Sequence, residues 1–280
     1  MDNRPIGVFD SGLGGLTAVK ELRRLLPQED IVYFGDTGRV PYGSRGRDTI
    51  LAFAAQDMAF LKRHDIKMVV SACGTVSSVM TDQLARSIGV PFTGVVLPTA
   101  QAACAASTTG VIGVIGTSAT VHSGSFARAV RNIRDDARVL GRPCPLFVPL
   151  VENGYIAPGN PVTKLVAQEY LSAFDDEPEM DTLILGCTHF PLIYDIIADY
   201  FHYDITLIDS GKATARYVEG FLTEQGMLAR REKPGETEYY VTDAADDFSS
   251  VAQRFLGSPL GDQVHRIPIE ELGALPQERK

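Results

Sequence analysis

The chain has 280 residues, a formal net charge of −9 and four cysteines, with 45% hydrophobic and 22% charged residues. This composition is ordinary for a globular protein, and the length suits one large or two ordinary domains. The negative charge argues against nucleic acid or an anionic membrane as a partner. Because we find no signal segment and no apolar run of membrane length, we expect a cytoplasmic protein with reduced thiols.

Strand-like and helical patterns alternate along the whole chain. Short apolar runs predict buried strands at residues 6–9, 31–34, 68–72, 91–98, 111–117, 183–187, 206–208, 237–242 and 264–267. Apolar residues at helical spacing predict helices at 15–26, 48–63, 76–88, 100–106, 124–133, 162–174, after Pro191 to 200, after Asp209 to 225, and 248–256. We expect loops at 35–47 and 153–161, and a short strand or loop at 147–152. The alternation predicts parallel sheets with helices on both faces.

Two kinds of turn each occur twice. The triplet Asp10-Ser11-Gly12 follows the first strand, and Asp209-Ser210-Gly211 follows a later one. Strands also end at Cys73 and at Cys187. The repetition suggests two related halves. We therefore predict two α/β domains, residues 1–97 plus 207–280 and residues 98–206, with one cysteine on each wall of the cleft between them.

The two strand-end cysteines are candidates for chemistry, whereas Cys104 and Cys144 are interpreted as buried hydrophobic residues. Thr188 can cap the helix after Cys187, and helix N-termini lower the pKa of a nearby thiol. Three possibilities follow: a cysteine protease, a redox pair, or two thiols acting as acid and base on opposite faces of one carbon. No Cys-x-x-Cys pair occurs and the five histidines are scattered, so we expect no metal site.

The glycine-rich turn Gly12-Leu13-Gly14-Gly15 does not match a dinucleotide-binding fingerprint, because Thr17 stands where that pattern needs glycine. We interpret it as a tight turn between a strand and a helix, whose N–H groups could hold a carboxylate.

Five motifs together resemble the bacterial glutamate racemases: Gly7-Val8-Phe9-Asp10-Ser11-Gly12, Pro41-Tyr42-Gly43-Ser44, Gly113-Val114-Ile115-Gly116-Thr117, Pro149-Leu150-Val151-Glu152 and Gly186-Cys187-Thr188-His189. The resemblance covers essentially the whole chain. It implies cofactor-independent interconversion of L- and D-glutamate, which supplies D-glutamate for peptidoglycan. It also implies two flavodoxin-like domains with the active site between them, and commonly a homodimer. Because the chain begins only a few residues before the first strand, we expect no activation by a peptidoglycan precursor.

The resemblance also implies roles for particular residues. Cys73 and Cys187 would be the two acid/base residues, with Asp10 assisting Cys73, and with Glu152 and His189 assisting Cys187. The positions that match substrate contacts are Asp10, Ser11, Tyr42, Gly43, Gly74, Thr75, Thr188 and His189.

Gly74 departs from the family, which has asparagine there as a substrate contact. Losing a hydrogen bond to a charged group costs about 1.5–3 kcal/mol, so we expect weakened activity. Two alternatives stay open: a related racemase for another substrate, such as aspartate or a hydantoin, and a non-catalytic regulatory protein that kept the fold. A Gly74→Asn variant separates them, because a large rise in kcat/KM would indicate a racemase site damaged by glycine.

Overall fold

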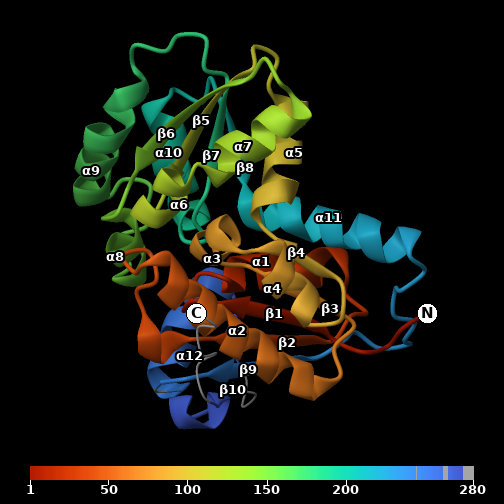
Figure 1. Ribbon diagram of the computed structural model, residues 1–280. Helices are drawn as coiled ribbons and strands as arrows, with labels where there is room; N and C mark the ends of the chain where they lie inside the picture. The colour runs from red at the N-terminus through yellow and green to blue at the C-terminus, as the bar shows by residue number, and fades with distance from the viewer. Residues whose placement is uncertain (244, 261–263, 274–280) are drawn as a thin grey trace.

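The computed structural model describes residues 1–243, 245–260 and 264–273, and the strands within these ranges form two parallel sheets, one in each of two stacked lobes (Figure 1). The first sheet has the order β10-β9-β2-β1-β3-β4, and the second has the order β6-β5-β7-β8. The strands of the first sheet are β1 Ile6–Asp10, β2 Ile31–Gly35, β3 Met68–Ser71, β4 Phe92–Gly94, β9 Thr237–Val241 and β10 Val264–Arg266. Those of the second are β5 Val111–Gly116, β6 Arg138–Pro143, β7 Thr182–Leu185 and β8 Thr206–Asp209.

Helices cover both sheets and fill the space between them. The α-helices are α1 Leu16–Leu25, α2 Arg47–Leu61, α3 Gly74–Val79, α4 Asp82–Ser87, α5 Val96–Ala106, α6 Ser118–Ser123, α7 Ser125–Ile133, α8 Phe147–Glu152, α9 Pro161–Leu171, α10 Tyr194–Tyr200, α11 Ser210–Glu224 and α12 Ala245–Leu256. Short 3-10 helices are η1 Thr37–Arg39, η2 Lys62–His64, η3 Ser172–Phe174, η4 Phe190–Ile193 and η5 Ile269–Leu272. Among the described residues, no helix has both the length and the apolar character needed to cross a bilayer.

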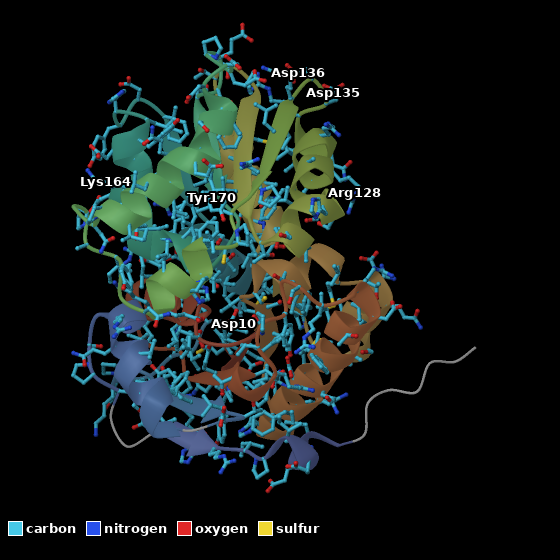
Figure 2. All side chains as sticks on the ribbon, turned by 90° about the vertical axis from the view of Figure 1, so that its left-hand side faces the viewer. Asp10, Arg128, Asp135, Asp136, Lys164 and Tyr170 are labelled. Carbon is cyan, nitrogen blue, oxygen red and sulfur yellow. The ribbon has the colours of Figure 1, made fainter. Side chains whose placement is uncertain are left out.

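The sheets form because their central strands are apolar on both faces. Every residue of β1, β5 and β7 is buried, as expected for parallel strands with helices on each side. Helix α1 packs through Leu16, Val19 and Leu22, which are fully buried at helical spacing. The predicted fold class, α/β with two flavodoxin-like parallel-sheet units, is confirmed. Figure 2 shows the two lobes from the side, with Asp10 in the first lobe close to the junction.

The proposed domain division remains a prediction, but strand pairing moves one of its boundaries. Residues 206–209 form β8, which pairs with β7 in the second sheet, so the predicted return to the first domain at residue 207 comes too early. The chain returns through α11, which packs against both α5 and α1 (Figure 1). The end of the predicted first domain, residues 274–280, lies outside the described residues.

Several predicted elements differ in length or type. The helix expected at 76–88 is two helices, because Met80 is extended and the Thr81 side chain accepts a hydrogen bond from Leu84 N–H to begin α4. The strand expected at 91–98 is limited to Phe92–Gly94, after which α5 begins at Val96.

Two further elements were not expected. Residues 147–152, predicted as a strand or loop, form helix α8. Strand β6 was missed because it is an edge strand, half-exposed and carrying Arg138 and Arg142, so it lacks an apolar run.

Candidate active site

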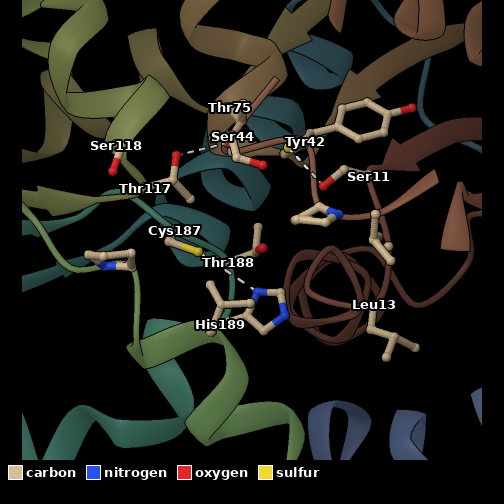
Figure 3. Close-up of a pocket in the computed structure, with 18 of the residues that line it drawn as sticks. Ser11, Leu13, Tyr42, Ser44, Thr75, Thr117, Ser118, Cys187, Thr188 and His189 are labelled. Atoms are coloured by element: carbon tan, nitrogen blue, oxygen red, sulfur yellow. Dashed lines mark hydrogen bonds between the residues drawn. The ribbon is translucent and has the colours of Figure 1, made fainter. Parts of the chain in front are cut away.

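A cavity of about 470 Å³ lies where the carboxyl ends of the strands of the two sheets meet (Figure 3). Ser11 and Cys73 reach it from the ends of β1 and β3, and Thr117 and Cys187 reach it from the ends of β5 and β7. Ligand sites in open α/β sheets occupy this edge because the loops there are free of the sheet's own pairing. The cavity therefore has one wall from each lobe, and each wall carries a cysteine.

Cys73 is surrounded by hydrogen-bonding groups of the first lobe. Its Sγ lies 3.2 Å from Ser11 Oγ and accepts a hydrogen bond from Val76 N–H at 3.5 Å, which caps α3. Burial and the nearby Asp10 carboxylate raise the pKa of Cys73 to about 12. Burial next to a negative charge outweighs the hydrogen bond from the N–H group of Val76 at the start of α3. Cys73 is held as a neutral thiol.

Asp10 is 1% exposed and ends β1 behind Cys73. Its Oδ2 accepts a hydrogen bond from Gly12 N–H at 3.0 Å, whereas Oδ1 has no hydrogen-bond partner among the described residues. Burial raises the pKa of Asp10 despite the main-chain donors and the charge of His189. Helix α1 is not capped by this side chain, since its N-cap residue is Gly15. Asp10 is not among the residues that line the cavity.

Cys187 has different neighbours, which form a chain of three side chains. Its Sγ lies 3.8 Å from His189 Nδ1, and His189 Nε2 lies 2.9 Å from Glu152 Oε1. Burial lowers the pKa of His189, but its hydrogen bonds to Cys187 and Glu152 outweigh this and raise the pKa to about 10. His189 is therefore an imidazolium near neutral pH. A positive charge beside a cysteine favours the thiolate as the nucleophilic or basic form.

The two thiols interact across the cavity. The charge of Cys187 contributes to the raised pKa of Cys73, although the two residues lie on different lobes. One cysteine stands beside carboxylate and hydroxyl groups and the other beside an imidazolium. The cavity thus places its two thiols in different electrostatic surroundings.

The structure brings most of the remaining predicted residues to the same cavity. Ser11, Gly43, Gly74, Thr75 and Thr188 all line it. Thr188 does not cap the following helix: η4 has His189 as its N-cap residue and no side-chain capping hydrogen bond.

Tyr42 reaches the cavity with its main chain. Its ring is 1% exposed and points away from the cavity (Figure 3), and its hydroxyl donates to Asp36. Any substrate contact at this position is therefore made by main-chain atoms.

Sequence reasoning missed a group of lining residues from the second lobe and the mouth of the cavity. Thr117 is the most informative, because its hydroxyl lies 3.0 Å from that of Thr75 on the opposite lobe. Its position directly after a glycine-rich strand was the feature of the sequence that could have identified Thr117 as a site residue. The other missed residues are Gly12, Leu13, Val40, Pro41, Ser44, Ser118, Pro145, Val148, Pro149 and Gly186.

The lobes are joined around the cavity by further polar contacts. Thr17 Oγ1 donates to the carbonyl of Thr188 at 3.1 Å, and Ala119 N–H donates to the carbonyl of Gly43 at 3.4 Å. On α12, Arg254 donates to the carbonyl of Glu152 at 2.6 Å. These contacts close the walls on each other and limit the access of water.

The cavity offers hydroxyl and N–H groups to an anion. None of the described residues that line it is lysine or arginine. Besides Tyr42, whose hydroxyl points away, six of them carry side-chain hydroxyl groups: Ser11, Ser44, Thr75, Thr117, Ser118 and Thr188. In the described ranges, no group of three or more His, Cys, Asp or Glu side chains is arranged to hold a metal ion. Apart from the His189 imidazolium, the donors that these described residues offer to an anionic ligand are neutral.

Comparison with known proteins places this arrangement in a family. Residues 14–218 match the family described as Asp/Glu/Hydantoin racemase. The chain belongs to this family. It is 42% identical over 267 residues to a glutamate racemase of Geobacter metallireducens, covering 95% of this chain and 97% of that protein.

Solved structures of the family share the fold. A glutamate racemase from Francisella tularensis, crystallised with D-glutamate, has a TM-score of 0.88 and 37% identity, covering 97% of this chain and all of the other. A glutamate racemase from Thermus thermophilus, crystallised with β-chloro-D-alanine, has a TM-score of 0.85 and 42% identity, with the same coverage.

Proposed function

We propose that this protein interconverts L- and D-glutamate without a cofactor, with Cys73 and Cys187 as the two acid/base groups. The observation that carries the proposal is the placement of two thiols on opposite walls of one cavity, each with its own proton partners. High identity to glutamate racemases over nearly the whole chain supports glutamate as the substrate.

The chemistry is a proton transfer at one carbon. The thiolate of one cysteine takes the Cα proton, and the electron pair of the C–H bond stays on the substrate as a carbanion-like state. The thiol of the other cysteine then gives its proton to the opposite face of Cα, which inverts the configuration and leaves this second cysteine as a thiolate. By family likeness, Cys187 acts on the L-isomer and Cys73 on the D-isomer.

Three further side chains support these transfers. Asp10 exchanges protons on the Cys73 side, and Glu152 with His189 does so on the Cys187 side. The hydroxyl groups that line the cavity bind the two carboxylates of the substrate and stabilise the developing charge. Such donors are effective in a closed site from which water is excluded, because they are already oriented.

Three properties follow from family likeness alone. We propose that the product D-glutamate is used for peptidoglycan, that the protein acts in the cytoplasm, and that it is a homodimer. Size-exclusion chromatography with light scattering tests the last point, and a monomeric mass for the active enzyme would contradict it.

The proposal is tested by polarimetry on purified protein without added cofactor. We expect both isomers of glutamate to racemise, aspartate to react more slowly, and turnover in heavy water to place deuterium at Cα. Cys73→Ser and Cys187→Ser should each abolish racemisation, whereas the matched control Cys104→Ser, which changes a cysteine outside the cavity, should not. Full activity in either cavity variant would refute the two-thiol mechanism.

A further inference from the structure

A buried group of charges lies directly behind the cavity wall formed by residues 41–44. Asp36, at the end of β2, and Asp57, in the middle of α2, are both fully buried. Arg39 pairs with both: its Nε lies 2.5 Å from Asp36 Oδ2, and its Nη2 lies 3.0 Å from Asp57 Oδ1. One guanidinium, on a side chain that is 10% exposed, thus faces two fully buried carboxyl groups, and an unbalanced charge is costly there.

The Tyr42 hydroxyl joins the two carboxyl groups. It donates a hydrogen bond to Asp36 Oδ2, and its oxygen lies 3.4 Å from Asp57 Oδ2. A phenol has one proton to donate, so the contact with Asp57 is satisfied when Asp57 is the donor. Burial and the charge of Asp36 both raise the pKa of Asp57 well above its usual range. A neutral Asp57 leaves one carboxylate paired with one guanidinium, and the charge balances.

Neighbouring groups tie this network to two other segments. Thr242, after β9, donates to Asp36 Oδ1 at 2.9 Å and accepts from Gly38 N–H at 2.8 Å. Gln56 accepts a hydrogen bond from Arg39 and donates to the carbonyl of Gly273 at 2.5 Å. The loop between β2 and α2 is therefore fixed from its buried side.

The other side of the same loop is the cavity wall. Pro41, Tyr42, Gly43 and Ser44 line the cavity, and the Gly43 carbonyl accepts a hydrogen bond from Ala119 of the opposite lobe. The Tyr42 ring points away from the cavity (Figure 3), and its hydroxyl belongs to the network behind the wall. Because the main chain of the same residue lines the cavity, we expect a shift of the ring to move the wall.

We propose that Asp57, which does not line the cavity, is a positioning residue that acts as a neutral hydrogen-bond donor to Tyr42 and so fixes the main chain of residues 41–44 for substrate binding. This inference rests on the proposed function, because the wall is taken to bind glutamate. Asp57 does not touch the substrate.

The groups that act on Asp57 come from three elements. Asp36, Arg39 and Tyr42 come from the end of β2 and the following loop, and Asp10 comes from β1. Burial and both aspartates favour the neutral form of Asp57, whereas Arg39 and a hydrogen bond from Tyr42 favour the charged form; burial and Asp36 outweigh them. A folded-state pKa above the unfolded value means that the native protein keeps a proton that the unfolded chain releases. The contribution of the Asp57 proton to the free energy of unfolding is therefore lost progressively as the pH rises above about 4. An asparagine at residue 57 needs no proton, so the melting temperature of Asp57→Asn relative to wild type should increase with pH.

The decisive experiment compares Asp57→Asn, which keeps a neutral donor, with Asp57→Ala, which removes it. In Asp57→Ala we expect KM for both isomers of glutamate to rise about tenfold or more with a smaller change in kcat, whereas in Asp57→Asn KM stays within about twofold of wild type. Hydrogen exchange measured without substrate should be faster over residues 37–46 in Asp57→Ala and unchanged in Asp57→Asn. If Asp57→Ala does not fold, Tyr42→Phe, which removes the central hydroxyl, should reproduce the faster exchange.

Glu29→Gln is the matched control, because it alters another buried carboxyl group that is paired with a cation, Lys67, and does not line the cavity. It should lower the melting temperature without changing KM or the exchange of residues 37–46. Equal impairment by Asp57→Asn and Asp57→Ala, or unchanged exchange in Asp57→Ala, would overturn the inference. If the wild-type protein fails to racemise glutamate, the proposed function is wrong. The hydrogen-exchange and melting-temperature measurements still test the role of Asp57 in that case.

Discussion

The carbonyl oxygen of Gly186 on the second lobe lies so close to Gly74 on the first that a Cβ atom at residue 74 would stand 2.3 Å from it. The neighbour is a main-chain atom, which cannot swing aside as a side chain can. Cys73 and Cys187 are each adjacent in sequence to one of these glycines. The distance between the two main chains at this point therefore helps to set the separation of the two thiols.

This contact changes the expected effect of Gly74→Asn. From the sequence alone, the asparagine was expected to restore a substrate contact and to raise kcat/KM. In the structure, any side chain at residue 74 has to push the lobes apart, and such overpacking costs about 1–3 kcal/mol. We now expect both Gly74→Ala and Gly74→Asn to lower kcat/KM by about 5- to 150-fold in a racemisation assay.

Gly159→Ala is the matched control, because a Cβ atom there meets no described atom within 4 Å. It should leave kcat/KM unchanged. A rise in kcat/KM with Gly74→Asn would instead show that the lobes separate at little cost, and that the missing amide limits the enzyme.

Glu152→Gln should lower the pKa of His189. The Glu152 carboxylate is one of two hydrogen-bonded partners that raise this pKa from 6.5 to about 10. Because the folded-state value is raised, the associated stability is fully present below pH 6.5 and is lost as pH rises towards 10. We expect the histidine NMR titration and the alkaline loss of stability to move to lower pH in Glu152→Gln and to stay in place in the exposed control Glu169→Gln. An unchanged titration would contradict the role assigned to Glu152.

The two cavity cysteines should differ in their rate of alkylation. Alkylation requires the thiolate, and Cys73 has its pKa raised to about 12 by burial and Asp10, whereas Cys187 lies beside the His189 imidazolium. At pH 7–8, peptide mass spectrometry should find iodoacetamide on Cys187 before Cys73, and D-glutamate should slow both reactions. Faster labelling of Cys73 would contradict the raised pKa of its thiol.

The sequence predicted the strands well where they are buried on both faces. Strands such as β1 and β5 are apolar on both faces and were found directly, whereas the half-exposed edge strand β6 was not. Helix α8 was missed because prolines flank it, although Pro149 lies in its first turn, where proline is tolerated.

The sequence predicted which residues form the site better than it predicted how they interact. Glu152 meets His189 across 37 residues of sequence, which local spacing does not reveal, and the family resemblance supplied that pair. The raised pKa of Cys73 was not predicted, because the sequence does not show that its thiol is buried beside Asp10. Pairings across the lobes, such as Thr75 with Thr117, depend on how the two sheets pack together.

Lys67→Met should destabilise the protein without a direct effect on catalysis. Lys67 Nζ is fully buried, lies 2.5 Å from Glu29 Oε2, and donates to the carbonyls of Asp2 and Met227 at 2.8 Å each. Removing one partner of a buried ion pair leaves the other charge uncompensated and costs about 3–5 kcal/mol. Thermal unfolding should show a clear fall in melting temperature, while KM measured well below that temperature stays unchanged. Arg86→Ala is the control, because the Arg86–Asp82 pair is exposed, and exposed pairs contribute about 0–1 kcal/mol. Equal melting temperatures for the two variants would show that the Lys67–Glu29 pair stabilises the first lobe no more than a surface pair does.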